Sequence, residues 1–276
     1  MQPLRRLAAA ALVLCLAATP ALADRAGRVM ELLRLDELIG IMREEGMQHG
    51  AEVGEAFLGP EAGAGWAATV ERIYDPAGMA ARMRAGLEGA LPDDPALREG
   101  IAAFFGSDLG RRVVELELSA RRAMLDPAIE EAARDAWDDM AADGGARVEA
   151  VRRFVAVGDL VEQNVVGGLN ATWAFYAGLR DSGAGMQGMS EADMLADVWS
   201  QQDAIRTEID GWLHGYLALA YGPLSEAELD AYVDFFDSPA GAALNGALFA
   251  GFNGMFEAVS RALGRAAGGR MLGEDL

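Results

Sequence analysis

The sequence predicts an all-α protein, a helical bundle built from two similar helical halves that follow a cleaved signal peptide. Three observations predict this class. Apolar residues recur at intervals of three and four, and no useful stretch alternates with period two. Cap residues followed by proline mark helix starts, and clusters of glycine and proline separate the helical segments. A motif with paired phenylalanines occurs twice along the chain.

The first 23 residues have the parts of a secretory signal peptide. Arg5 and Arg6 precede an apolar run from Leu7 to Ala18. Small residues at Ala21 and Ala23 then mark a cleavage site. The apolar run is shorter than the roughly 20 residues that span a bilayer, so cleavage after Ala23 is favoured over an uncleaved anchor. We therefore expect a periplasmic protein.

Composition excludes several classes of site and partner. Cleavage removes Cys15, the single cysteine, so disulfides, thiolate metal sites and cysteine nucleophiles are excluded. The remaining chain has 21 arginines, no lysine and 43 acidic residues, which gives a net charge of −22 (21 minus 43). This charge repels phosphate backbones and anionic membranes, so nucleic acid is not an expected partner. No later apolar segment is long enough to cross a membrane.

Amphipathic stripes locate the expected helices. Leu229, Tyr232, Val233 and Phe236 fall at positions i, i+3, i+4 and i+7 of one helix. Similar stripes run through 97–105 and 244–263. The expected first residues of the helices are capped: Ser225 with Glu228 forms an S-x-x-E capping box. The other expected caps are Asp94, Asp126 and Ser238, each before a proline, and Ser190.

Four segments are expected to interrupt the helices. They lie at Gly59-Pro60 through Gly65, at Gly144-Gly145, from Ser182 to Gly188, and at Gly222-Pro223.

The repeated motif indicates an internal duplication. Residues 104–110 read Phe-Phe-Gly-Ser-Asp-Leu-Gly, and residues 235–241 read Phe-Phe-Asp-Ser-Pro-Ala-Gly. The shift of 131 residues between Phe104 and Phe235 is much longer than the period of a solenoid. We expect a divergent first helical repeat at 24–145 and a second repeat at 146–276. Chance similarity is the alternative, because few identities lie outside the motif.

Each copy of the motif predicts a tight corner between two helices. The two aromatic rings would enter the core, the serine would cap the next helix, and the glycine would permit a close backbone approach. A nucleophilic serine is the alternative, but the sequence offers no recognisable base for it. The predicted structural residues are Phe104, Phe105, Ser107, Gly110, Phe235, Phe236, Ser238, Pro239 and Gly241.

The second copy of the motif resembles a known bacterial family. The string Leu-Ser-Glu-Ala-Glu-Leu at 224–229, followed by the motif at 235–241, is similar to the conserved corner of the domain of unknown function 2059 family. The resemblance is best over 224–258. The first copy is more divergent, since Asp108 replaces the proline and Leu97-Arg98 replaces the capping box. The resemblance implies an exported, all-helical protein and supplies no catalytic residues.

Candidate chemistry is sparse. His49 and His214 belong to no metal-binding pattern, so helix-surface positions are favoured over a shared metal site. Met186, Met189 and Met194 could hold Cu(I), although cover for apolar surface is favoured. The acidic run from Glu130 to Asp139 is expected to be a solvated helix face rather than a cation site. We therefore predict no catalytic, cofactor-binding or metal-ligating residue and no cofactor.

The sequence favours a non-enzymatic protein that binds another envelope protein. The alternative is a carrier of lipids or small molecules, with an apolar cavity between the two helical halves. An enzyme is disfavoured because no catalytic motif is present.

Overall fold

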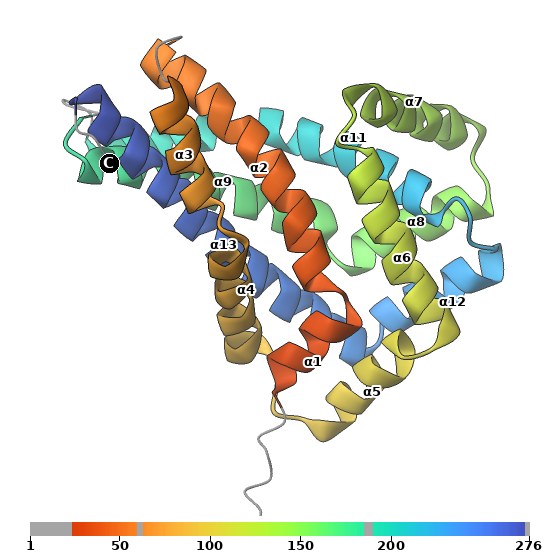
Figure 1. Ribbon diagram of the computed structural model, residues 1–276. Coiled ribbons are helices and arrows are strands. Elements are labelled where there is room, and N and C mark those ends of the chain that lie inside the picture. The colour runs from red at the N-terminus through yellow and green to blue at the C-terminus, as the bar shows by residue number, and fades with distance from the viewer. Residues whose placement is uncertain (1–23, 60–62, 185–189, 274–276) are drawn as a thin grey trace, which may run out of the picture.

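A computed structural model describes residues 24–59, 63–184 and 190–273, and the described residues are almost entirely helical (Figure 1). The expected signal peptide at 1–23, together with Met186 and Met189, lies outside the described residues. The helices are α1 (Arg25–Leu32), α2 (Leu35–Leu58), α3 (Gly63–Ile73), α4 (Pro76–Ala90), α5 (Pro95–Phe105), α6 (Asp108–Ala123), α7 (Pro127–Asp143), α8 (Ala146–Val157), α9 (Leu160–Asp181), α10 (Glu191–Ser200), α11 (Gln202–Tyr221), α12 (Glu226–Phe236) and α13 (Pro239–Met271). The all-α fold is thereby confirmed.

Local capping chemistry sets many of these boundaries. Ser225 and Glu228 form the expected capping box at the start of α12. Ser190 and Asp193 form a second one at α10. Asp94, Asp126 and Ser238 accept the predicted backbone hydrogen bonds at α5, α7 and α13. The expected caps are therefore confirmed.

The long helix α13 is the centre of the packing. In Figure 1 it crosses the molecule diagonally, with α3 and α4 beside it, and it packs most extensively against α9. Gly264 makes this approach possible, because a Cβ atom at this position would lie 2.1 Å from the carbonyl oxygen of Phe175 on α9. Leu244, Met255 and Leu263 are buried along the predicted stripe. Among the described residues, no helix combines the length and apolarity that crossing a membrane requires.

Two local features occur in the same order in the earlier and the later part of the chain. A left-handed residue separates α1 from α2 at Arg34, and another separates α8 from α9 at Asp159. The two motif corners then join α5 to α6 and α12 to α13. The division at 145 and the duplication remain predictions.

The two motif copies meet each other. The ring of Phe104 stacks on that of Phe235, with centroids 4.1 Å apart and planes 11° from parallel. Phe105 packs edge-on against Phe235 at 5.4 Å. On the other side of α12, Phe236 packs against Phe154 of α8 at 4.4 Å. The aromatic pairs therefore fill the junction between α5 and α12 with stacked and edge-on ring contacts.

Both corners use the same backbone geometry. Ser107 accepts a hydrogen bond from the backbone N–H of Gly110 at 3.0 Å, and Ser238 accepts one from Gly241 at 3.1 Å. Each serine hydroxyl also donates to the first phenylalanine carbonyl of its motif. A Cβ atom at Gly110 or Gly241 would lie 2.1 or 2.2 Å from that same carbonyl oxygen. The backbone that approaches each glycine is thus the end of the preceding helix.

We predict that Phe236→Ala lowers the free energy of unfolding by about 3–5 kcal/mol, as truncation of a core aromatic generally does. The side chain is 7% exposed and contacts the rings of Phe154 and Tyr232. Denaturant unfolding of the purified protein measures the change. Phe57→Ala is the matched control, because Phe57 is 39% exposed, and its loss should be clearly smaller. Equal losses in the two variants would remove the α12 corner from the core.

Candidate functional site

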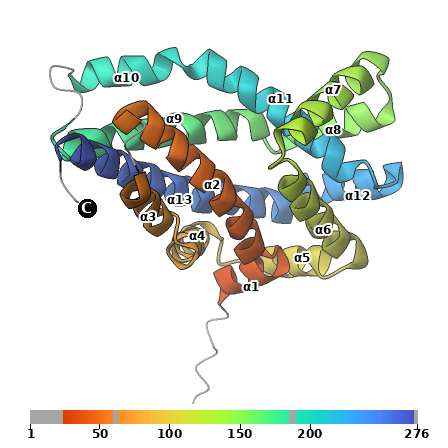
Figure 2. The same cartoon turned by 45° about the horizontal axis from the view of Figure 1, so that its top comes forward.

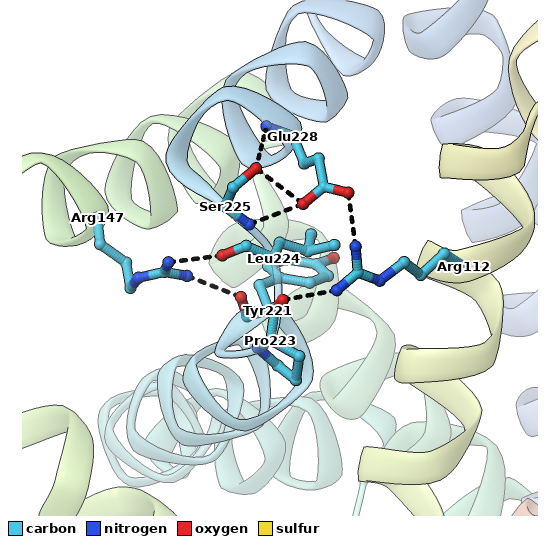
Figure 3. Close-up of polar contacts among 7 residues, drawn as sticks. All are labelled: Arg112, Arg147, Tyr221, Pro223, Leu224, Ser225 and Glu228. Carbon is cyan, nitrogen blue, oxygen red and sulfur yellow. Dashed lines mark hydrogen bonds and ion pairs between the residues drawn. The ribbon is translucent and has the colours of Figure 1, made fainter.

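Two arginines hold the loop between α11 and α12. Arg147 on α8 donates to the carbonyl oxygens of Tyr221 at 2.7 Å and Leu224 at 2.6 Å. Arg112 on α6 donates to the carbonyl of Pro223 at 2.7 Å and to the carboxylate of Glu228 at 2.6 Å. Figure 3 shows the two guanidinium groups approaching the loop from opposite sides.

This arrangement satisfies backbone groups that a helix end leaves without partners. The last carbonyls of α11 have no intrahelical donor, and they carry the negative end of the helix dipole. Guanidinium groups offer several N–H donors in a planar fork, so one arginine can bind two carbonyls. The loop that follows α11, including Pro223, is therefore fixed from both α6 and α8.

A carboxylate from α6 lies beneath the same loop. Glu117 accepts hydrogen bonds from the hydroxyls of Tyr221 at 2.7 Å and Tyr232 at 3.0 Å. Burial raises the pKa of the Glu117 carboxyl, and the two hydroxyl donors oppose this rise without cancelling it. Burial and the neighbouring Glu117 charge raise the pKa of both tyrosines well above the ordinary value. The phenols therefore remain protonated and act as donors.

An ion pair adjoins this cluster. Arg121, one turn beyond Glu117 on α6, binds the carboxylate of Glu45 on α2 through two hydrogen bonds of 2.6 Å. Its guanidinium carbon lies 4.6 Å from the ring centroid of Trp212 on α11. Hydrogen bonds of this paired kind are strong and directional. Helix α6 is thereby tied to α2, α11 and α12.

An apolar groove runs between α7 and the end of α11. It has a volume of about 760 Å³. One wall is a stripe on α7, and the other comes from α11 and the loop held by the two arginines. The lining residues are Ala128, Ile129, Ala132, Ala133, Ala136, Met140, Ala218, Leu219, Gly222 and Pro223. Ile129 and Leu219 are 39% and 37% exposed, so two large apolar side chains face solvent at the groove.

A second face of α7, which adjoins the groove wall, is acidic. Glu131, Asp135, Asp138 and Asp139 are exposed there. Glu130 and Glu208 both pair with Arg134, so this arginine offsets part of the charge. The groove is therefore an apolar strip with a negative border. In the part of the chain that the structure describes, no three acidic or histidine side chains are grouped as metal ligands would be.

The comparison with protein families identifies one segment of the chain. Residues 94–139 match DUF2059. This family is described as an uncharacterized protein conserved in bacteria. No curated protein and no solved structure matches the chain. The resemblance to this family is confirmed, and the matched residues lie on the first copy of the motif rather than on 224–258, where the resemblance from sequence was best.

The DUF2059 match covers much of the candidate site. It begins at Asp94, the cap of α5, and ends within α7. It therefore contains Phe104, Arg112 and Glu117, together with the α7 wall of the groove. The family-matched segment accordingly supplies α5, together with α6, which contacts the α11–α12 loop, and most of α7, which forms one wall of the groove.

The structure places the predicted residues at the two corners, away from the groove. The serine hydroxyls of the motif are used in capping, as described above. His49 is exposed beside Glu52, and His214 stacks on Trp137 at 4.6 Å, so the two histidines lie in separate settings. Met194 is fully buried.

The groove and the polar cluster were missed by sequence reasoning. The alanines of α7 that line the groove follow helical spacing, so the sequence contains a signal for this apolar face. It contains no such signal for the polar cluster, because Glu117 and Arg147 bind residues that are far away in the sequence.

We predict that Arg147→Gln destabilises the protein by about 2–3 kcal/mol, because two charge-assisted bonds disappear and the Leu224 carbonyl loses its donor. Arg152→Gln is the control. Arg152 lies on the same helix and, among the residues that the structure describes, pairs only with the exposed Glu149 one turn away, so its removal should cost much less. Chemical denaturation of both variants provides the comparison, and a neutral Arg147→Gln would refute the anchoring role.

We predict that Glu117→Gln gains stability relative to the unmodified protein as pH rises above about 4.5. A carboxyl whose folded pKa is raised stabilises the fold below its unfolded value and loses that contribution as pH rises through the folded pKa. Melting temperatures between pH 4 and 8 measure the difference.

Glu162→Gln provides the control with the opposite sign. Its side-chain bond to Arg206 lowers the pKa of Glu162, so that contribution is present above about 4.5 and lost as pH falls. Relative to the unmodified protein, the melting temperature of Glu117→Gln should rise with pH and that of Glu162→Gln should fall. If both variants changed in the same direction, the raised pKa that we assign to Glu117 would be wrong.

Proposed function

We propose that this protein is an exported, non-enzymatic factor of the bacterial envelope that binds a partner protein through the groove between α7 and α11. The observation that carries the proposal is the exposed apolar groove, whose α7 wall lies largely within the family-matched segment. The signal-peptide pattern at 1–23 supports export to the periplasm.

The shape of the groove suits a helix. The α7 wall is mostly alanine, which lets another backbone approach closely, and Ile129 and Leu219 offer larger apolar anchors. Helix α7 has 17 residues, a length of about 25 Å at 1.5 Å per residue. Amphipathic helices bind in grooves of this kind through residues at spacings of three and four.

The border of the groove defines the charge of the partner. The exposed acids of α7 lie beside the apolar strip, and the sequence as a whole carries a net charge of −20. A helix with basic residues flanking its apolar face would be attracted, whereas an acidic helix would be repelled. The proposed occupant is therefore a basic amphipathic helix of another envelope protein.

The junction of the two motif corners argues against a carrier cavity there. Phe104 and Phe235 stack directly, and Phe105 packs against them. These rings occupy the space in which the alternative function would place an apolar ligand.

Site-specific photocrosslinking in the source bacterium tests the proposal. A crosslinker at Ala132 should capture one periplasmic protein, and mass spectrometry should locate the crosslink on a basic amphipathic helix. The captured chain should begin at Asp24 if export and cleavage occur as proposed. A synthetic peptide of the crosslinked helix should then bind the purified protein.

Ile129→Asp should weaken binding of that peptide at least about tenfold, because it places a charge in the apolar strip. Leu195→Asp is the matched control, since Leu195 is also exposed, at 45%, but lies on α10. Both variants should retain the melting temperature of the parent protein. Equal binding by both variants, or crosslinks to an acidic segment, would reject the groove as the site.

A further inference from the structure

Helix α10 has two apolar faces. One face is buried: Met194 is fully covered, and Val198 packs in a cluster with Val165 of α9. The other face is exposed, and its residues fall at positions i, i+3, i+4 and i+7, so they share one side of the helix. We call this face the α10 stripe; it consists of Ala192, Leu195, Ala196 and Trp199.

The α10 stripe faces away from the rest of the protein. In Figure 2, α10 lies at the outer edge of the molecule, with α9 between it and α13. Trp199 is 54% exposed and Leu195 is 45% exposed. A helix on the surface of a protein normally presents polar residues to solvent. Large apolar side chains grouped on an exposed face mark contacts with other molecules, and tryptophan is enriched at the centres of protein interfaces.

The α10 stripe carries no charge, although the sequence has a net charge of −20. The three acids of α10 lie outside the stripe, and each has a partner in its own chain. These pairs are Glu191 with Arg180, Asp193 with Ser190, and Asp197 with Tyr176. Two copies of this acidic chain can therefore approach each other along the stripe without placing like charges directly opposite.

The stripe is also complementary to itself in size. Two α10 helices can run antiparallel around a two-fold axis between Leu195 and Ala196. Trp199 of one copy then lies opposite Ala192 of the other, and Leu195 lies opposite Ala196. Each large side chain meets a small one, as packing of one helix surface into another requires. The two-fold axis repeats every such contact.

The same arrangement brings opposite charges toward each other at its two ends. Arg180 lies beside the first turn of α10 through its pair with Glu191. The exposed Asp203 follows Trp199 by one turn. Because the two helices are antiparallel, Arg180 of one copy is on the same side as Asp203 of the other. The charges around the stripe are thus complementary as well.

We propose that α10 joins two copies of this chain in an antiparallel two-fold dimer, with Trp199 of each copy against Ala192 of the other. A fully covered aromatic side chain buries only about 150–250 Å². The four side chains of the stripe therefore supply less than the about 800 Å² that each partner buries in a standard stable complex. The dimer should accordingly be reversible, with a dissociation constant above about 10 μM. This contact goes beyond the proposed binding of a partner helix.

Sedimentation velocity of the full mature chain tests the proposal. The concentration should run from about 5 to about 500 μM in about 0.15 M salt, where a Debye length of about 8 Å screens the repulsion between acidic copies. A reversible conversion of monomer to dimer is expected across this range.

Variants connect the dimer to the stripe. Leu195→Asp and Trp199→Ala should each weaken dimerisation at least about tenfold, because the first places a charge in the contact and the second removes its largest side chain. Combining Ala192→Trp with Trp199→Ala should restore the affinity to within about threefold of the parent, since the exchange keeps each large side chain opposite a small one. Such recovery is specific to the antiparallel register.

Ile129→Asp is the matched control. Ile129 is also exposed, at 39%, but it lies in the α7–α11 groove, so this variant should dimerise like the parent. Melting curves at low concentration should be unchanged for all variants, because every substituted side chain is exposed.

Several results would overturn the proposal. They are monomers at every concentration, an unchanged dimer in Leu195→Asp, and no recovery in the double variant. Monomers that instead cosediment with phosphatidylcholine vesicles would assign the stripe to a lipid surface. A dimer lost in Ile129→Asp but kept in Leu195→Asp would place the contact in the α7–α11 groove. None of these measurements contains a partner helix, so the proposed function keeps its own crosslinking test.

Discussion

The stacking of Phe104 on Phe235 is the contact on which the rest of the structure depends. The two rings come from helix ends that are followed at once by capped corners, so their position also sets the directions of α6 and α13. Helix α6 then carries Arg112 and Glu117 to the α11–α12 loop. Because aromatic rings are rigid and favour a few relative orientations, one partly buried ring pair can fix several helices at once.

The groove between α7 and α11 follows from a break in the chain after α6. Asp126 and Pro127 end one helix and begin another, because proline cannot continue the backbone hydrogen bonds of α6. At the shift of 131 residues, the corresponding positions are Glu257 and Ala258, which lie inside the uninterrupted α13. The break lets α7 turn back against α11. Arg112 and Arg147 then hold the α11–α12 loop, which forms part of the opposite wall of the groove.

Apolar surface and charge would have separate roles in the groove that we propose as a binding surface. The apolar strip between α7 and α11 would contribute most of the contact area with a partner helix. The exposed acids of α7 would discriminate among helices of similar shape, because they attract basic side chains and repel acidic ones.

The sequence by itself determined the all-α class, many helix boundaries and the corner at each motif, because caps, prolines and short apolar stripes act within a few residues. It did not locate the candidate site. Glu117 meets Tyr221 across 104 residues, and Arg147 meets the carbonyl of the same residue across 74. Such partners are chosen by how the helices pack, and nothing in the local pattern around Glu117 distinguishes a buried carboxylate from an exposed one. Only the tertiary structure decided which alanines of α7 face a groove and which arginines hold the loop between α11 and α12.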